Sequence, residues 1–158
     1  MLDKNKILNE LVTKAKSDYE GLKAALGTTK GHASDSDMKA EGKYDTRSIE
    51  AGYLAGAQKV RVDELENEVK LLEEINLNLG NDLICIGSLV EIELNQNKRL
   101  YFISSTAGGT ILNIDNHPIL VISAFSPIGD CAIGLGKNDT FDIENKNGIR
   151  EYTICNIW

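Results

Sequence analysis

The chain has few of the residues that build disulfide frameworks and metal sites. Its 158 residues include three cysteines and two histidines. Cys85, Cys131 and Cys155 lie far apart in the sequence, in no C-x-x-C pair and with no histidine at metal-ligand spacing. This pattern argues against a disulfide framework and a zinc site, and it predicts buried thiols in a reducing compartment.

Long apolar runs are also missing. No window approaches the roughly 18 consecutive apolar residues that a membrane-spanning helix needs. The first residues, Met1 to Lys6, lead into an alternately charged segment instead of the apolar core of a signal peptide. We therefore expect a soluble, cytoplasmic protein.

Positive charge is in the minority. The chain has 17 Lys and Arg residues against 24 Asp and Glu residues, which gives a formal net charge of -7. A negative surface repels phosphate backbones, so strong direct binding to nucleic acid is disfavoured. A basic surface on a partner protein, or a metal ion held by carboxylates, suits this charge better.

Proline is nearly absent, and its position divides the chain. Pro118 and Pro127 both lie in the second half, where β-branched and aromatic residues also gather. The first half is rich in Lys, Glu, Leu and Ala, which favour helices. Gly80-Asn81-Asp82 is a C-cap and turn signal between the halves. The sequence therefore predicts two domains, residues 1–80 and residues 83–158.

The first domain shows helical periodicity in two segments. Apolar residues recur every three or four positions from Asp3 to Leu26, which predicts a long amphipathic helix. Helical spacing resumes after Asp45 or Thr46, either of which is a candidate N-cap, and continues to Leu79. The apolar positions of this second segment are Ile49, Tyr53, Gly56 and Val60, then the coiled-coil series Val62, Leu65, Val69, Leu72 and Ile75. We expect an antiparallel coiled-coil hairpin, because each apolar stripe then covers the other.

The segment between these helices, at about residues 31–46, lacks an apolar stripe. It contains several acids, glycines and serines, and Met38 is its only large aliphatic residue. Such a composition buries little surface, so it predicts an exposed acidic tip at the end of the hairpin.

The second domain has the pattern of short strands separated by turns. The candidate strands are Leu89 to Leu94, Leu100 to Ser104, Thr110 to Ile114, Leu120 to Ala124, Thr140 to Ile143 and Glu151 to Ile157. Turn residues separate them, and Gly108-Gly109 is explained by a hairpin turn. The pattern predicts a small, mostly antiparallel β domain, and the whole chain belongs to the α+β class.

A short helix interrupts this series of strands. Ser126 is a residue type that caps helices, and Pro127 follows at the first helical position. We expect one short helix that packs on the sheet through Ile128, Cys131 and Ile133.

Two stretches of the sequence resemble one known family. The tip, Asp37-Met38-Lys39-Ala40-Glu41-Gly42-Lys43-Tyr44, is similar without gaps to the pattern Asp-Leu-x-Glu-Asn-x-Glu-Tyr of the Gre transcript-cleavage factors. The stretch from Ser126-Pro127-Ile128-Gly129 to Asp139 resembles the Ser-Pro-Leu-Gly segment, the Leu-Gly-Lys-Lys stretch and the Gly-Asp turn of the same family. The resemblance spans most of the chain.

This resemblance implies a fold, a partner and a cofactor. In the Gre family the second domain is FKBP-like and docks at the rim of the secondary channel of bacterial RNA polymerase. The hairpin enters the channel, where tip carboxylates help to hold Mg²⁺ at the polymerase active centre and promote cleavage of backtracked RNA. The resemblance makes Asp37, with Glu41 as a helper, the candidate catalytic residue, and Asp37 the candidate metal ligand. It implies no cofactor bound by the free protein, and contact with nucleic acid only through the polymerase.

The tip departs from the family pattern at two positions. Ala40 stands where the second acid is expected, with the Glu41 carboxylate one residue later, and Lys43 replaces an acid. These changes favour an alternative, a channel regulator that binds polymerase without promoting cleavage. A further alternative is that Asp37 and Glu41 simply solvate a loop.

The remaining candidates have two explanations each. Ser126, Pro127 and Gly129 lie in a segment near the docking surface of the family, or they serve folding alone. Tyr44 supports the tip, or it covers the start of the second helix.

An FKBP-like fold also suggests a prolyl isomerase or protein-binding module, although few aromatic residues are available to line a proline pocket. We expect a monomer, and the Glu-rich base of the second helix leaves a dimer open.

Overall fold

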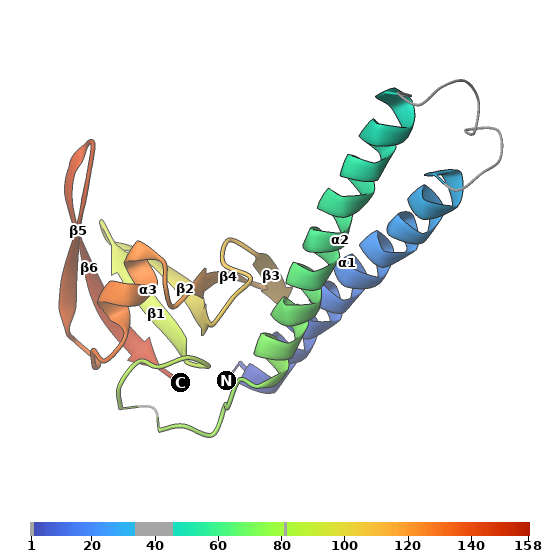
Figure 1. Cartoon of the computed structure of the whole chain (residues 1–158). Coiled ribbons are helices and arrows are strands. Elements are labelled where there is room, and N and C mark those ends of the chain that lie inside the picture. Colours follow the sequence, from blue (N-terminus) through green and yellow to red (C-terminus); the bar gives the residue numbers. More distant parts are fainter. Residues whose placement is uncertain (1, 34–45, 81) are drawn as a thin grey trace. The chain divides into compact units, whose positions relative to one another are not determined.

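The computed structural model describes residues 2–33, 46–80 and 82–158 (Figure 1). Contacts divide the chain into two compact units, Thr13–Val69, and Met1–Val12 together with Lys70–Trp158. The domain boundary expected between residues 80 and 83 stays a prediction.

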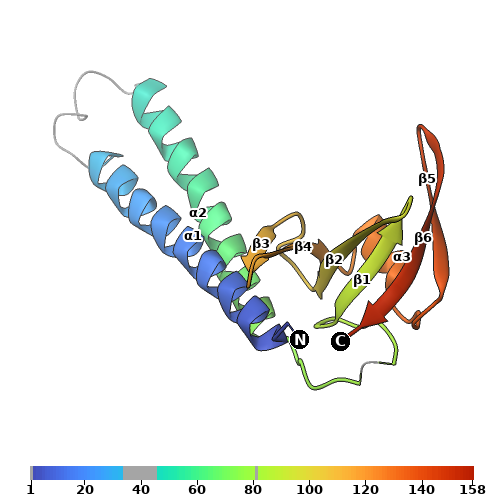
Figure 2. The ribbon, with the colours of Figure 1, turned by 180° about the vertical axis from the view of Figure 1, so that it is seen from behind.

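Two long helices precede the strands, which confirms the expected helical pair. Helix α1 spans Lys4–Ala33 and helix α2 spans Thr46–Glu73, and they run side by side in both views (Figures 1 and 2). Helix α1 continues beyond the expected end at Leu26. Asp3 caps its start by accepting a hydrogen bond of 2.9 Å from the Asn5 backbone N–H, which lowers the pKa of the Asp3 carboxyl. None of the described helices combines the length and the hydropathy that a membrane-spanning segment requires.

Burial divides the apolar positions of the helices into two groups. The buried group is Ile7, Leu11, Ala15 and Leu26 in α1, and Val62, Leu65, Val69 and Leu72 in α2. Ile49, Tyr53 and Val60 of α2 are exposed instead, so the prediction that they continue the hairpin seam is wrong. The step from Val60 to Val62 turns a helix by about 200°, and it moves the apolar stripe to the opposite face.

Helix α2 ends at Glu73, before the expected end at Leu79. The side chain of Asn76 accepts a hydrogen bond of 2.9 Å from the Asn78 backbone N–H. This Asx turn competes with helical hydrogen bonding. The carbonyl oxygen of Asn76 also lies 2.9 Å from the position that a Cβ would take at Gly87, so only glycine fits there without a shift.

A six-stranded sheet and one short helix form the rest of the chain. The elements are β1 (Leu89–Leu94), β2 (Asn97–Ser104), β3 (Ile111–Ile114), β4 (His117–Ser123), α3 (Pro127–Ala132), β5 (Thr140–Asn145) and β6 (Gly148–Ile157). The strand order is β3-β4-β2-β1-β6-β5, and every pairing is antiparallel except the parallel β2–β4 pair. The predicted α+β class is confirmed. Because β4 lies between β2 and β3, the turn at Gly108-Gly109 joins strands that are not neighbours, so the hairpin expected there is wrong.

The core of the sheet domain is apolar, and α3 contributes to it. Its buried members are Ile84, Val90, Ile92, Tyr101, Ile103, Ile122, Ala124, Ala132, Phe141, Tyr152 and Ile154. In α3 the buried residues are Gly129 and Ala132, while Ile128 is partly buried and Cys131 and Ile133 are exposed. The expectation that Cys131 and Ile133 pack on the sheet is therefore wrong, and Ile133 lies just beyond the end of the helix, as its C-cap.

The cysteines are more accessible than the sequence suggested. Cys85 and Cys155 are partly buried and Cys131 is exposed, and all three are free thiols. The prediction of buried thiols is therefore wrong. Burial raises the pKa of Cys155, and the carboxylates of Glu93 and Glu91 add to this effect while Lys98 opposes it, so the thiol stays protonated at neutral pH.

Candidate functional site

The predicted tip residues lie outside the described residues. This applies to Asp37, Glu41 and Tyr44, and to the substituted positions Ala40 and Lys43. Within residues 2–33, 46–80 and 82–158, no group of three or more His, Cys, Asp or Glu residues is placed to hold a metal ion. The assignment of Asp37 as a metal ligand stays a prediction that rests on the sequence pattern.

The second predicted group, Ser126, Pro127 and Gly129, meets at the start of α3. Ser126 has an extended backbone and caps the helix. Its Oγ donates a hydrogen bond of 2.7 Å to the carbonyl oxygen of Ser123, and it accepts one of 3.1 Å from the backbone N–H of Gly129. Pro127 occupies the first helical turn, where its missing N–H is not needed. These interactions fix the turn by which β4 leads into α3.

Gly129 packs directly against the end of β4. A Cβ at this position would overlap the carbonyl oxygen of Ser123, and it would lie 3.0 Å from the Cα of Ala124. No side chain fits in that space without moving the backbone of β4. The contacts thus give Ser126 and Gly129 a role in folding, whereas their contact with a partner stays a prediction.

Ser126→Ala is expected to lower the free energy of unfolding by about 1–2 kcal/mol, because the helix loses its cap and the Ser123 carbonyl loses a donor. Ser126→Thr keeps the hydroxyl and should remain within about 0.5 kcal/mol of the parent chain. Urea unfolding followed by circular dichroism measures both changes. Equal losses in the two variants would show that the hydroxyl has no such role.

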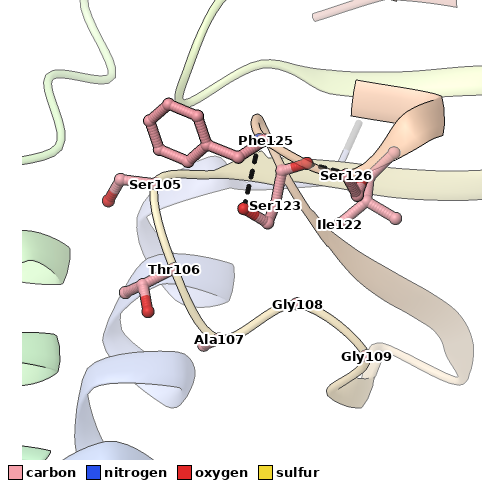
Figure 3. A pocket seen from close by; sticks show the side chains of 9 residues that line it. All are labelled: Ser105, Thr106, Ala107, Gly108, Gly109, Ile122, Ser123, Phe125 and Ser126. Carbon is pink, nitrogen blue, oxygen red and sulfur yellow. Dashed lines mark hydrogen bonds between the residues drawn. The ribbon is translucent and has the colours of Figure 1, made fainter. Parts of the chain in front are cut away.

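An open pocket of about 420 Å³ lies beside this turn (Figure 3). Its lining comes from the loop after β2, the end of β4 and the start of α3, and comprises Ser105, Thr106, Ala107, Gly108, Gly109, Ile122, Ser123, Phe125 and Ser126. Most of these lining residues have small or hydroxyl-bearing side chains, and Phe125 is the aromatic residue among them. The pocket has the size of a cleft for a single side chain or a small ligand.

Phe125 combines a fixed backbone with an exposed ring. Its backbone N–H donates a hydrogen bond of 3.2 Å to Ser123 Oγ, and the neighbouring Ala124 N–H donates one of 2.8 Å to the Ser104 carbonyl. The side chain is nevertheless 83% exposed. A large unburied ring on a fixed backbone is the kind of residue that anchors protein interfaces. Sequence reasoning missed Phe125 as a site residue, because an aromatic residue that follows a strand is usually part of the core.

A curated protein sequence is similar to nearly the whole chain. No family model matches the chain. The transcription elongation factor GreA of Syntrophus aciditrophicus (strain SB) is 29% identical over 153 residues, which cover 90% of this chain and 92% of that protein. The resemblance to the Gre family is confirmed.

Gre-type proteins also occur among similar solved structures. Gfh1 of Thermus aquaticus shares 19% identity with this Gre-like chain at a TM-score of 0.41, covering 97% of this chain and 92% of its own. A GreA/GreB factor of Nitrosomonas europaea shares 16% identity at a TM-score of 0.39, covering 61% of this chain and 77% of its own. The resemblance to the Gre family rests on the sequence similarity to GreA and not on these structures.

The turn that ends the Gre-like stretch is well defined by hydrogen bonds. Asn138 adopts the left-handed conformation, with φ of 71°, which asparagine tolerates better than most residues. Asp139 Oδ2 accepts a hydrogen bond of 2.7 Å from the Gly136 N–H, and its carbonyl accepts one of 2.9 Å from the Ile154 N–H. These bonds tie the loop after α3 to β6, so the Gly-Asp-like turn has a structural role in this chain.

Proposed function

We propose that this chain is a transcription elongation factor of Gre type, which binds bacterial RNA polymerase in the cytoplasm and places its hairpin in the secondary channel. The similarity to GreA over nine tenths of the chain carries the proposal. The order of elements supports it, because a pair of long helices precedes a sheet domain that contains the Gre-like stretch from Ser126 to Asp139. The net charge of -7 favours a basic surface as the partner.

The proposed activity is stimulation of the cleavage of backtracked RNA by the polymerase, so the chain is not an independent enzyme. Asp37, helped by Glu41, would contribute carboxylate oxygens to Mg²⁺ at the polymerase active centre. This donor set consists of oxygen alone, which suits Mg²⁺, and one or two carboxylates complete a site whose other ligands belong to the polymerase. Mg²⁺ held there would supply activation of a water for attack on the RNA phosphodiester. Asp37 and Glu41 supply negative charge at that place.

The test of this proposal is RNA length in stalled elongation complexes. Binding to purified polymerase is measured first, by pull-down of the full chain. The same complexes, with RNA labelled at its 3′ end, should then release short 3′ fragments when the chain is added. Failure to bind polymerase would exclude the whole proposal, while binding without fragments would exclude only the cleavage activity.

A second function, occupation of the channel without cleavage, is favoured by Ala40 and Lys43. A missing acid and an added positive charge both weaken the attraction of a cation to the tip. This function predicts altered initiation or pausing while RNA length stays constant. If it holds, the double variant Ala40→Glu with Lys43→Glu should gain fragment release, because it restores the acids of the family pattern.

Phe125 is proposed as a polymerase contact at the docking surface of the sheet domain. Phe125→Ala is expected to weaken binding to polymerase by about tenfold or more, as loss of an aromatic anchor does at other interfaces. Its unfolding free energy should change by less than about 0.5 kcal/mol, because the ring is exposed. Ile111→Ala, at another exposed apolar residue, is the matched control for binding. Equal binding by the two variants would remove Phe125 from the interface.

A further inference from the structure

Helix α2 carries a second apolar stripe that the hairpin does not bury. Ile49, Tyr53 and Val60 are 50%, 77% and 59% exposed. At about 100° per residue these positions fall within about 40° of one another around the helix. The buried residues Val62 and Leu65 lie on the opposite face. The two stripes therefore serve different contacts.

Two glycines lie beside the exposed stripe and leave its backbone open. A Cβ at Gly52 or Gly56 would meet nothing within 4 Å, so packing in the described part of the chain does not require either glycine. Each glycine lowers helix stability relative to alanine. A bare backbone next to exposed apolar side chains instead permits another helix to approach closely, since the distance between packed helices depends on the side chains at the contact.

We propose that this stripe is a self-association surface, on which α2 of a second copy of the chain packs antiparallel. A two-fold interface must be self-complementary. If one residue of the first copy contacts a second residue of the other copy, the same two residues also make the contact with the copies exchanged. An antiparallel pair centred on the stripe places Ile49 against Val60 of the second copy. It also places Tyr53 over the open backbone at Gly56. The large Tyr53 ring thus meets the small Gly56 on both copies.

The flanking charges favour the same antiparallel pairing. Glu50 and Arg61 are exposed on one side of the stripe, where Arg61 also forms an exposed ion pair of 2.9 Å with Glu64 of the same helix. Positions on the same side meet when two helices pack antiparallel, and such flanking charges decide orientation in coiled coils. The pairing therefore gives two contacts between Glu50 of one copy and Arg61 of the other. A parallel pair would place Glu50 far from Arg61, because the two residues lie at opposite ends of the stripe.

Sedimentation equilibrium of the full chain, from micromolar to near-millimolar concentration, tests the proposal. The parent chain is expected to show a reversible monomer–dimer equilibrium. Tyr53→Ser should raise the dimer dissociation constant by about tenfold or more, because it removes the central ring. Ile149→Ser replaces an exposed apolar residue of β6 and should leave the constant unchanged. A chain that stays monomeric throughout, or a dimer that Tyr53→Ser leaves intact, overturns the proposal.

Charge reversal tests the orientation. Glu50→Arg and Arg61→Glu should each weaken the dimer by roughly threefold to tenfold, and the double variant should return to within about threefold of the parent chain. Circular dichroism checks that helix content is unchanged in all three. A double variant as weak as the single variants contradicts the antiparallel pairing. No polymerase is present in either experiment, so the outcome is independent of the proposed function.

Discussion

Asp37→Ala is expected to reduce the release of 3′ RNA fragments from backtracked complexes by at least about 100-fold. Removing a metal ligand should cost more than removing a group that only supports a ligand, which costs about 10- to 100-fold. The rate is measured in a single turnover with labelled RNA and saturating factor. Binding of the variant to polymerase should stay close to that of the parent chain, because docking is assigned to the sheet domain.

The tip offers a matched control for this substitution. Asp35→Ala removes the same group two residues earlier, at a position outside the family pattern, and should keep nearly full activity. Glu41→Ala should give a smaller loss than Asp37→Ala, since Glu41 is assigned as a helper. If Asp35→Ala and Asp37→Ala were equally impaired, the tip acids would act through general charge and not through a ligand at Asp37.

Gly129→Ala is expected to destabilise the sheet domain by about 3 kcal/mol, at the upper end of the usual cost of overpacking. The added Cβ would overlap the Ser123 carbonyl oxygen. The end of β4 cannot move away freely, because the Ala124 N–H is bonded to the Ser104 carbonyl at 2.8 Å. Relief of the overlap therefore breaks hydrogen bonds that the sheet needs. Urea unfolding of the full chain, followed by circular dichroism, measures the loss.

Gly27→Ala is the matched control for this prediction. Gly27 lies within α1, and a Cβ there meets nothing within 4 Å. The substitution should stabilise the chain by up to about 1 kcal/mol, because alanine has the higher helix propensity. Equal effects of the two substitutions on unfolding would show that the close approach at Gly129 does not limit stability.

Local patterns in the sequence were sufficient to predict most of the elements. The expected strand from Leu89 to Leu94 coincides with β1, because its alternation of apolar and polar residues matches the period of a strand. The start of α3 was also predictable, since Ser126 and Pro127 act through their own backbone geometry. In both cases the structure depends on chemistry within a few residues.

Features that depend on distant contacts were not predictable. β2 pairs in parallel with β4, and which strand it pairs with depends on contacts between distant segments. No single run of residues therefore predicts this pairing. Val60 and Val62 both fit a helical apolar pattern, yet they lie on opposite faces of α2. Helical spacing alone does not tell whether an apolar stripe is covered by the other helix or left exposed.

In the candidate site, too, some residues were predictable from the sequence, while the roles of others depend on contacts that only the structure shows. The sequence left Ser126 and Gly129 with two explanations, and the contact of Gly129 with Ser123 is what gives them a folding role. Phe125 was missed because its exposure depends on the turn from β4 into α3. Asp37 and Glu41 were found through the resemblance to the Gre family, since acids in a polar segment have no chemistry that singles them out.

The most direct test of the account is to map where the polymerase-bound chain meets the catalytic metal. Fe²⁺ exchanged into the polymerase active centre reduces added hydrogen peroxide to hydroxyl radicals, which cut only polypeptide close to the metal. We expect the end-labelled chain to be cut within residues 34–45, the stretch that contains Asp37, whether or not RNA is cleaved. Cuts confined to residues 83–158, or no cuts in a chain that is bound, would contradict it.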